Sequence, residues 1–457
     1  MLGQAVAPYE YFNPMRPHPT VERWRSRSTF VLALAIAAAG LGNVWRFAYL
    51  MGENGGAPFL FSYVFCLLVV GAPLLIAEVV LGSHGRGSPL LTLDWATEVS
   101  GRSRLWLVVA LLSCSAGFLL LACYLVIAGW SLDYAYQLQL SAFAALGLED
   151  TGAVFAQRLD EPAAFLRWQL LAAALLAVIC AAGVRRGIGL MAWISVPLLM
   201  VLLGVLCRYA IDFGNLEAAG EYLFRWQSID FHGASFMAAM VHAVYTLCVG
   251  VAFGMTYGAY TPDKLPIVRS VLAVAFFDVV VAVAIGVAVF PLVFASNLLP
   301  SDGFGLLFIS LPYAYGNLPF GDVYGALFFI AIFVIAMGTA VALMEPAVAI
   351  LEQQFNIRRV HAAAALAALA WALSALATTD LSADGFFQWL DSTTADVLIP
   401  LGGLLLAVFV GWRMPRAVLR KELIREPDIL FTVWYFLIRF VAGPVIIIAW
   451  LWLYLVP

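Results

Sequence analysis

An aspartate and two neutral oxygen-bearing residues stand inside long apolar segments of the sequence. Asp278 is preceded by two phenylalanines and followed by three valines, while Asn43 and Thr246 each lie close to a pair of glycines. Carboxylate, amide and hydroxyl oxygens, together with backbone carbonyls, are the ligands that a hard cation prefers. Because an unpaired carboxylate at membrane depth is costly, such groups generally mark ion or proton pathways. The three residues therefore predict an ion site, and the alternative is that Asp278 is a structural partner for a neighbouring helix.

The glycines beside these residues predict interruptions in two helices. Gly40-Leu41-Gly42-Asn43 lies within one apolar segment, and Gly250-Val251-Ala252-Phe253-Gly254 lies within another. Glycine weakens a helix by about 1 kcal/mol relative to alanine, and freed carbonyls are tolerated at membrane depth only around a polar cavity. Matched interruptions in the two halves of a chain are typical of a binding site at the midplane of a transporter. The alternative is that these glycines permit close packing between helices.

The composition indicates which elements must position these residues. Of the 457 residues, 64% are hydrophobic and 11% are charged, whereas a soluble globular protein is about half apolar and about a quarter charged. The net charge of −4 provides no basic surface for nucleic acid. A helix needs roughly 20 apolar residues to cross a bilayer. We therefore expect an all-α polytopic membrane protein with eleven spans, at 28–50, 57–83, 105–138, 167–184, 188–210, 234–260, 267–296, 321–355, 360–379, 385–413 and 429–456.

The basic residues predict how these spans are oriented. With the N-terminus in the cytoplasm, 18 of the 24 lysines and arginines fall in cytoplasmic segments and four fall on the opposite side. This is the asymmetry of the positive-inside rule, and an odd number of spans then places the C-terminus outside. The polar, proline-rich N-terminus lacks the apolar core of a signal peptide. The sequence contains no Asn-x-Ser/Thr sequon, which favours a bacterial inner membrane.

Several stretches are similar to the signature of the neurotransmitter:sodium symporter family. They are Glu22-Arg23-Trp24, GLGNVWRF at 40–47, ENGGAPF at 53–59, Pro73-Leu74 with Glu78 and Gly82, and LIPLGG at 398–403. The bacterial branch with eleven spans is the most similar. The resemblance implies the five-plus-five inverted repeat of the bacterial leucine transporter type, with spans 1 and 6 unwound. It divides the chain into a cytoplasmic segment at 1–27, two repeats at 28–210 and 234–413, and span 11 at 429–456.

The resemblance also implies sodium-driven uptake of an amino acid by alternating access, and it indicates the binding residues. The first sodium would meet the carbonyl of Ala38, the side chains of Asn43, Thr246 and Asp278, and the substrate carboxylate. That carboxylate would also meet the backbone amides of Leu41 and Gly42, which open a half-helix whose positive end suits an anion. Ala38 and Thr246 would border the substrate as well, and the other pocket residues would be Gly40, Leu120, Tyr124, Tyr245, Cys248, Val251, Thr339 and Leu343.

Gly40 and the pocket residues predict the kind of substrate. Members of the family that carry monoamines have an aspartate in the stretch of Gly40, where it stands in for a missing substrate carboxylate. Glycine therefore indicates a substrate that brings its own carboxylate. The other pocket positions carry no charge, so we expect a neutral, hydrophobic amino acid.

The second sodium site departs from the family pattern. By resemblance it would use the carbonyls of Ile36, Ala39 and Ile335 and two adjacent side-chain oxygens. The sequence offers Gly338-Thr339 at that pair, so Thr339 alone supplies a side-chain oxygen. We expect this site to be impaired, rebuilt or absent.

The chloride site of the family is also altered. Ala282 occupies the position of its serine, whereas Asp278 occupies the neighbouring asparagine position. A negative charge beside sodium makes chloride unnecessary on electrostatic grounds. We therefore expect chloride-independent transport, with Tyr63, His242 and Thr246 around this region.

The resemblance predicts an outer gate and an altered inner one. Arg46 matches the cationic member of the outer ion pair, and its partner in span 10 is Asp391, with Asp396 close enough to compete. At the inner end, Val21 and Gln353 replace the Arg–Asp pair of the family. Closure there must use other contacts, and the candidates are Trp24, Arg23, Glu352 and Tyr260. Three further charged residues lie in spans, and we expect Glu78 and Glu345 to satisfy polar partners and Arg439 to snorkel or to contact another copy.

The leading prediction is a sodium-coupled symporter that binds a small neutral amino acid and sodium ions within the lipid bilayer. The alternative is a ligand-binding or transport-impaired relative that acts as a membrane sensor, suggested by Gly338 and the altered inner gate. An enzyme is disfavoured because no nucleophile–base pair, metal cluster or phosphate-binding loop is present in the sequence. A channel is disfavoured because the outer gate residues are retained.

Overall fold

Nine helices in the described part of the chain are long and apolar enough to cross a bilayer. The computed structural model describes residues 21–226, 231–262, 265–301, 303–381 and 385–455, so most of the predicted cytoplasmic segment 1–27 lies outside the described residues. Spans 1 and 6 of the sequence prediction are not among the nine helices because each is broken into shorter pieces. Nine continuous spans and two broken ones make up the eleven that the sequence predicts.

The continuous spans follow the predicted boundaries to within a few residues, and several contain more than one labelled element. They are span 2, with α4 (Ala57–Cys66), η1 (Leu67–Gly71) and α5 (Ala72–Gly85); span 3, α7 (Leu107–Gln139); span 4, α9 (Pro162–Ala181); span 5, η3 (Val184–Ile188) and α10 (Gly189–Phe213); span 7, α14 (Ile267–Ala295); span 8, α17 (Gly321–Phe355); span 9, α18 (Arg359–Thr379); span 10, α19 (Phe386–Ser392), η5 (Thr393–Leu398), α20 (Ile399–Val408) and η6 (Phe409–Arg413); and span 11, α22 (Asp428–Phe436), η7 (Leu437–Ala442) and α23 (Gly443–Leu455). Short helices connect them: α6 (Pro89–Val99), η2 (Arg104–Trp106), α8 (Leu148–Asp160), α11 (Leu216–Phe224), α15 (Gly303–Gly305), η4 (Leu306–Ser310), α16 (Leu311–Asn317) and α21 (Arg416–Glu422).

Span 1 is broken next to the predicted glycines. Helix α1 (Arg27–Ala38) starts after Ser26, whose hydroxyl accepts a hydrogen bond from the amide of Thr29. The chain then leaves the helix and resumes in α2 (Gly42–Trp45) and α3 (Phe47–Glu53). A Cβ on Gly40 would lie 2.9 Å from the Tyr124 hydroxyl oxygen. A glycine is therefore needed here for the backbone of the break to approach α7.

Span 6 is broken between α12 (Gly233–Thr246) and α13 (Phe253–Ala259). Three residues of the connecting segment have positive φ, namely Cys248 at 48°, Gly250 at 91° and Ala252 at 65°. Such a conformation costs roughly 1–2 kcal/mol for a residue with a Cβ, so contacts must hold it in place. The Glu78 Oε1 atom accepts a hydrogen bond from the Gly250 amide at 2.8 Å. The break begins at Leu247, before the first glycine, and it ends before Gly254, which already belongs to α13.

Helices of the first half pack against their counterparts in the second half. Contacts join α1 to α13, α5 to α14, α7 to α17, and α9 to α18. These are spans 1 and 6, 2 and 7, 3 and 8, and 4 and 9. Such pairing is expected when two repeats of five spans face each other around one axis, so it agrees with the predicted inverted repeat.

Span 2 runs beside both halves of span 6. A Cβ on Gly71 would lie 2.7 Å from the carbonyl oxygen of Ala243 in α12, and one on Gly82 would lie 1.8 Å from that of Met255 in α13. Small residues allow helix backbones to approach this closely in membranes. One continuous span is thus packed against each side of the break.

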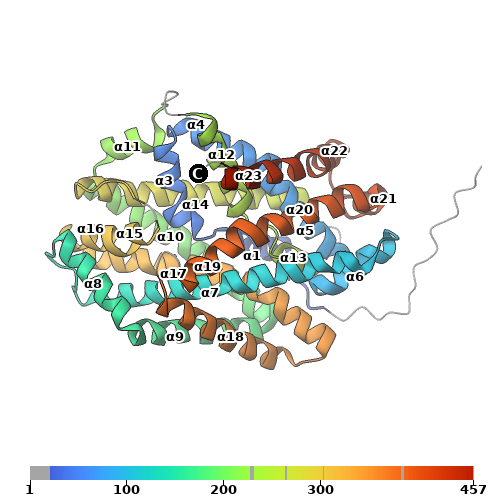
Figure 1. Ribbon diagram of the computed structural model, residues 1–457, viewed down its shortest axis with the longest axis horizontal. Helices are drawn as coiled ribbons and strands as arrows, with labels where there is room; N and C mark the ends of the chain where they lie inside the picture. Colours follow the sequence, from blue (N-terminus) through green and yellow to red (C-terminus); the bar gives the residue numbers. More distant parts are fainter. Residues whose placement is uncertain (1–20, 227–230, 263–264, 302, 382–384, 456–457) are drawn as a thin grey trace, which may run out of the picture.

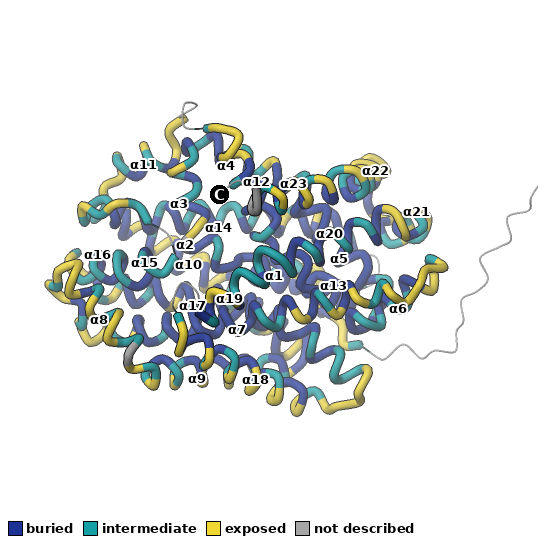
Figure 2. Tube along the Cα trace, viewed as in Figure 1, coloured by how far each residue is buried: buried dark blue, intermediate teal, exposed yellow. Residues whose placement is uncertain are grey.

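The two ends of the molecule carry different connections (Figure 1). Helices α6, α21 and α22 lie at one end, and α8, α11, α15 and α16 lie at the other. We call the first the basic end, because Arg86, Arg185, Arg359, Arg413 and Arg416 lie in the loops and helix ends there. Figure 2 shows buried residues through the central helices and exposed residues along the outer side of α9 and α18.

Candidate functional site

Asn43, Thr246 and Asp278 meet at the two helix breaks. They belong to α2, the last residue of α12, and the middle of α14, and are 1%, 6% and 0% exposed. The Asn43 side-chain nitrogen donates to Asp278 Oδ1 at 2.6 Å, and Thr246 Oγ1 lies 3.1 and 3.0 Å from the two carboxylate oxygens. Thr246 Oγ1 is also 3.1 Å from Asn43 Oδ1. The three side chains predicted for the first sodium site are therefore in direct contact around a buried carboxylate.

Tyr63 is the fourth side chain of this group. It is buried on α4, and its hydroxyl donates to Asp278 Oδ2 at 2.6 Å. The ring of His242 lies 5.4 Å from that of Tyr63, and its Nε2 is buried without a hydrogen-bond partner among the described residues. We call Asn43, Tyr63, Thr246 and Asp278 the Asp278 cluster. Its oxygens suit a hard cation, and the described residues contain no group of three or more His, Cys, Asp and Glu that would suit a transition metal.

The break in span 1 faces Tyr124. The hydroxyl of Tyr124 accepts a hydrogen bond from the Leu41 amide at 3.2 Å. The carbonyl of Ala38 accepts one from the Gly40 amide at 2.7 Å, which turns the chain at the break. Leu41 and Gly42 then begin α2, so their amides are among those that have no partner within the helix. The backbone groups and the tyrosine predicted to hold a carboxylate thus lie side by side.

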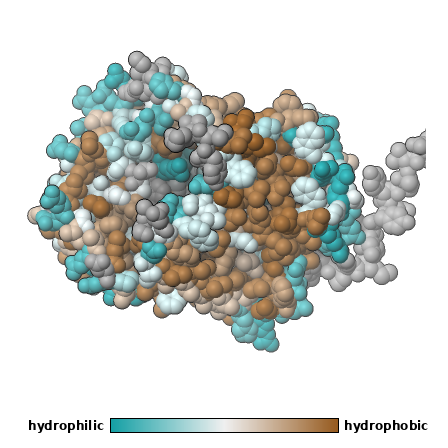
Figure 3. All heavy atoms as spheres, in the orientation of Figure 1, coloured by the Kyte–Doolittle hydropathy of each residue, from teal (hydrophilic) through white to brown (hydrophobic). Residues whose placement is uncertain are grey.

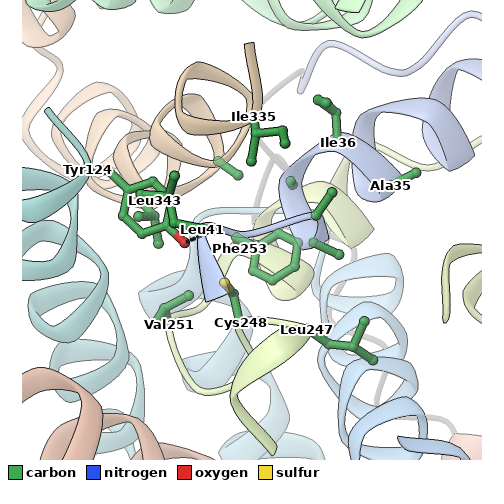
Figure 4. Close-up of a cluster of buried hydrophobic side chains, with 14 of the residues drawn as sticks. Ala35, Ile36, Leu41, Tyr124, Leu247, Cys248, Val251, Phe253, Ile335 and Leu343 are labelled. Carbon is green, nitrogen blue, oxygen red and sulfur yellow. Dashed lines mark hydrogen bonds between the residues drawn. The ribbon is translucent and has the colours of Figure 1, made fainter. Parts of the chain in front are cut away.

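Apolar side chains surround the Tyr124 hydroxyl. Figure 4 shows that hydroxyl pointing at the backbone of Leu41, with Leu343, Val251 and Cys248 close by. A Cβ on Gly117 would lie 3.3 Å from the Val251 Cβ, so α7 approaches the break of span 6 at this glycine. The remaining predicted pocket residues are the buried Leu120 and Thr339 and the half-buried Tyr245. Gly117 therefore lies against the break of span 6. The sequence analysis did not identify it, because a single glycine in a long helix does not indicate a binding site.

Ile36 packs against Gly338, where the predicted second sodium site lacks a side-chain oxygen. A Cβ on Gly338 would lie 2.4 Å from Ile36 Cγ1 and 2.9 Å from the Ile36 carbonyl oxygen. The Thr339 hydroxyl donates to the carbonyl of Ala37 at 3.1 Å, and Ala39 and Ile335 are buried beside it. Ile36 therefore occupies the space that a side chain at position 338 would need.

The predicted outer gate residues are not in contact. Arg46 lies exposed between α2 and α3, and Asp391 is half-buried on α19. Among the described residues, the ion pairs within 4.0 Å do not include Arg46. The structure thus places Arg46 within the broken span 1 and Asp391 near the start of span 10, without an ion pair between them.

At the basic end, Trp24 closes the inner side of the break. Its amide donates to the Tyr260 carbonyl at 2.8 Å, and its indole nitrogen donates to the Tyr257 carbonyl at 3.0 Å. The indole also packs edge-on against both tyrosine rings. Gln353, which stands in the acidic position of the inner gate, accepts a hydrogen bond from the Ser88 amide at 2.6 Å. Of the four candidates, Trp24 and Tyr260 therefore join the segment just before α1 to the end of α13.

A buried ion pair supports Tyr260. Its hydroxyl donates to Glu345 Oε1 at 2.6 Å, and Arg359 Nη2 lies 2.7 Å from Glu345 Oε2. Arg359 also reaches Glu352 at 3.2 Å and the Cys180 carbonyl at 2.7 Å. Glu345 therefore has polar partners, as expected, but the sequence did not indicate Arg359. No periodic pattern predicts that an arginine at the start of one span reaches a glutamate 14 residues earlier across a loop.

Comparisons with known proteins agree with this geometry. The family described as "Sodium:neurotransmitter symporter family" matches residues 21–146 and 153–456. The sodium-dependent transporter YhdH of Bacillus subtilis strain 168, whose name carries the word uncharacterized, is 29% identical over 440 residues, covering 94% of this chain and 97% of that protein. The sodium-dependent dopamine transporter of Bos taurus is 25% identical, covering 86% of this chain and 63% of that protein.

A solved structure shares the fold. The crystal structure of MhsT in complex with L-phenylalanine superposes with a TM-score of 0.84 at 32% identity, covering 94% of this chain and 99% of that chain. The broken spans, the paired repeats and the oxygen cluster thus occur in a chain whose sequence matches one family almost from end to end. The chain is a multi-pass membrane transporter with sodium as its coupled ion, not an enzyme, and it belongs to the sodium:neurotransmitter symporter family.

Proposed function

We propose that this symporter imports a neutral, hydrophobic amino acid by alternating access. The observation that carries the proposal is the position of the Asp278 cluster directly beside the span 1 break, whose amides face Tyr124. A cation held by the cluster would lie next to a carboxylate held by those amides, so each ligand would strengthen binding of the other. The L-phenylalanine bound to MhsT supports a substrate with a large apolar side chain.

Selection for the substrate follows from the groups around Leu41. Its amide and that of Gly42 lie at the positive end of α2 and can bind an anion. Leu343, Val251 and Cys248 offer apolar surface and no charge to a side chain. A charged side chain would lose its hydration there without a partner, which is costly. The site therefore requires a carboxylate and favours an uncharged side chain.

Two side chains indicate which ions accompany the substrate. Asp278 places a negative charge inside the cluster, so a sodium ion there needs no chloride, and we infer chloride-independent transport. Ile36 Cγ1 lies 2.4 Å from the position that a Cβ at residue 338 would take, so the second site lacks one side-chain oxygen and has no room for it. We therefore infer that one sodium ion, at the first site formed by the Ala38 carbonyl and the side chains of Asn43, Thr246 and Asp278, drives each cycle. The second site would then bind no ion. Its other implied ligands, which are the carbonyls of Ala39 and Ile335 and the hydroxyl of Thr339, would have a structural role only.

The orientation that we propose follows the positive charges. The basic end faces the cytoplasm of a bacterial inner membrane, and the C-terminus lies outside. Arg46 and Asp391 then border the outer entrance, where their pairing closes the route above Tyr124. Trp24 and Tyr260 close the inner route.

The test is uptake by the purified full chain in liposomes, with L-phenylalanine, L-leucine, L-lysine and phenethylamine as substrates. We expect phenylalanine or leucine to accumulate above equilibrium only under an inward sodium gradient. Phenethylamine, which lacks the carboxylate, and lysine, which is charged, should not accumulate. Replacing chloride by gluconate should leave uptake unchanged. Sodium-independent accumulation would contradict the proposal, and sodium-dependent binding without accumulation would favour the membrane-sensor alternative.

A further inference from the structure

Arg439 lies within span 11 and has aromatic neighbours in place of a carboxylate. Its guanidinium carbon is 4.7 Å from the ring centre of Trp412, 5.4 Å from that of Phe440 and 5.7 Å from that of Tyr435. The indole nitrogen of Trp412 donates to the Arg439 carbonyl at 2.8 Å, which fixes η6 against η7. Aromatic rings therefore hold the Arg439 guanidinium in place, and it forms no ion pair with a carboxylate of the described residues.

A second arginine shares the same tyrosine ring. The guanidinium carbon of Arg416 is 5.3 Å from the ring centre of Tyr435. The carboxylates in this region are engaged elsewhere, because Asp428 pairs with Arg420 and Glu426 pairs with Arg269. Two like charges near one ring repel each other, so an anion between them would be favoured. We call Trp412, Arg416, Tyr435 and Arg439 the Arg439 cluster.

The Arg439 guanidinium also has unused donors. It carries five N–H groups, and within the described residues one nitrogen, Nη1, donates to the Tyr435 hydroxyl at 2.9 Å. Its Nε is buried without a hydrogen-bond partner there, so the donors open to an external anion are those of the two terminal nitrogens. Because aromatic rings cover the faces of a guanidinium but not its edge, the in-plane donors stay available for phosphate, which guanidinium groups bind well.

The cluster lies at the boundary between the apolar belt and the basic end. Trp412 and Arg413 end span 10, and Trp412, Phe436 and Phe440 are exposed on the outer surface. Figure 3 shows hydrophobic atoms over the region of α20 and α23 and hydrophilic atoms toward the end where α21 and α22 lie. A ligand at this height must present an anionic group to the arginines and apolar chains to the exposed aromatic residues. Basic pockets between membrane helices on the cytoplasmic side bind lipid headgroups in this way.

We propose that the Arg439 cluster binds the phosphodiester of an anionic glycerophospholipid, in the membrane leaflet at the basic end. The site is separate from the Asp278 cluster and goes beyond the transport function. The phosphate accepts hydrogen bonds from Arg416 and Arg439, and the acyl chains lie along Trp412 and the exposed face of span 11.

Native mass spectrometry of the detergent-purified full chain, titrated with phosphatidylglycerol or phosphatidylethanolamine, tests the proposal. We expect one phosphatidylglycerol to be retained at concentrations at which phosphatidylethanolamine is lost. Since a basic residue near a membrane surface contributes about 1 kcal/mol to binding of anionic lipid, R416Q and R439Q should each lower the phosphatidylglycerol affinity about fivefold. R425Q, which removes an exposed charge from the same loop region, is the matched control and should leave the affinity unchanged.

Several outcomes would overturn the proposal. They are equal retention of the two lipids or equal affinity in R416Q and R425Q. A shift from monomer to dimer that depends on Arg439 without any lipid would assign the cluster to a second copy of the chain. Arg416 is exposed, so R416Q tests the site even where R439Q fails to fold. Sodium-driven uptake by R416Q is measured separately. A loss of uptake would report on transport and not on lipid binding.

Discussion

At the scale of single residues, Asp278 determines the chemistry of the central site. It accepts hydrogen bonds from Asn43 and Tyr63, and Thr246 lies within hydrogen-bonding distance of both its oxygens. The sequence predicted three of these four residues from their oxygen atoms and their places beside the breaks. Tyr63 was placed near the chloride region but not among the ligands, because a tyrosine in an apolar span is ordinarily a packing residue. Which atoms contact the carboxylate depends on how four helices cross, and no local pattern encodes that crossing.

Replacing Asp278 by asparagine tests the charge of this site. The side chain keeps its size, but the negative charge beside the cation is lost. Removing one member of a close, buried charge pair costs about 2 kcal/mol or more, so the sodium affinity should fall by roughly 30-fold or more. Sodium titration of phenylalanine binding measures this change. Unchanged sodium affinity in D278N would remove Asp278 from the ion site, and a new requirement for chloride would support the proposed role of its charge.

A second residue-scale prediction concerns Ile36 and Gly338. In the wild-type chain we expect a Hill coefficient for sodium near one. Gly338→Thr alone should lower the melting temperature, because its Cβ would lie 2.4 Å from Ile36 Cγ1. The double variant I36A/G338T restores space and supplies a hydroxyl beside Thr339, so the Hill coefficient should rise above one. If the double variant folds but its Hill coefficient stays at one, residues other than Ile36 and Gly338 must also prevent binding of a second sodium ion.

At the scale of elements, the sequence predicted the two helix breaks but not the contacts that close the inner end. Paired glycines predicted both breaks, although the observed break in span 6 begins at Leu247, before its glycines. At the basic end, Val21 and Gln353 indicated that the usual inner pair is missing. The replacement contact needed the fold, because Tyr260 on α13, Glu345 on α17 and Arg359 on α18 come together only through helix packing.

The Glu345–Arg359 pair gives a prediction about how α17 and α18 support α13. Removing one member of a buried ion pair costs about 3–5 kcal/mol, because it leaves the other charge without compensation. R359Q should therefore lower the melting temperature and the uptake rate more than the double variant E345Q/R359Q. R358Q, which changes the exposed neighbouring arginine, should resemble wild type. A double variant that is as unstable as R359Q, or more so, would contradict this reading of the pair.

At the scale of the whole molecule, the loop between spans 10 and 11 is tied to span 2. The carboxylate of Glu422 on α21 accepts a hydrogen bond from Ser83 at 3.1 Å and pairs with His84, both on α5. Burial alone would raise the pKa of Glu422, but the hydrogen bond and charge of His84, together with Ser83 and Arg86, lower the pKa below its usual value. The second repeat is thus joined at its end to the first.

This tie should depend on pH. A carboxylate with a lowered pKa in the folded state stabilises the fold above its unfolded pKa of about 4.3 and loses that contribution as the pH falls through the lowered value. At pH 7, E422Q should lower the melting temperature by about 2 °C, and the difference from wild type should vanish once the pH has fallen below the lowered pKa of Glu422. D428N, which alters a largely exposed pair, should change little. A difference that persists undiminished at acid pH would mean that Glu422 acts through packing rather than charge.

The position of span 2 has a consequence for how span 6 can move. A broken helix is commonly regarded as a hinge, yet α12 and α13 both rest at backbone distance on one continuous span, at Gly71 and Gly82. Span 2 therefore bridges the break in span 6. We therefore expect the two halves of span 6 to tilt together with span 2, and this group of helices to slide against α17, which α13 contacts. On this view the break exposes backbone groups to ligands without letting the two halves of the span move independently.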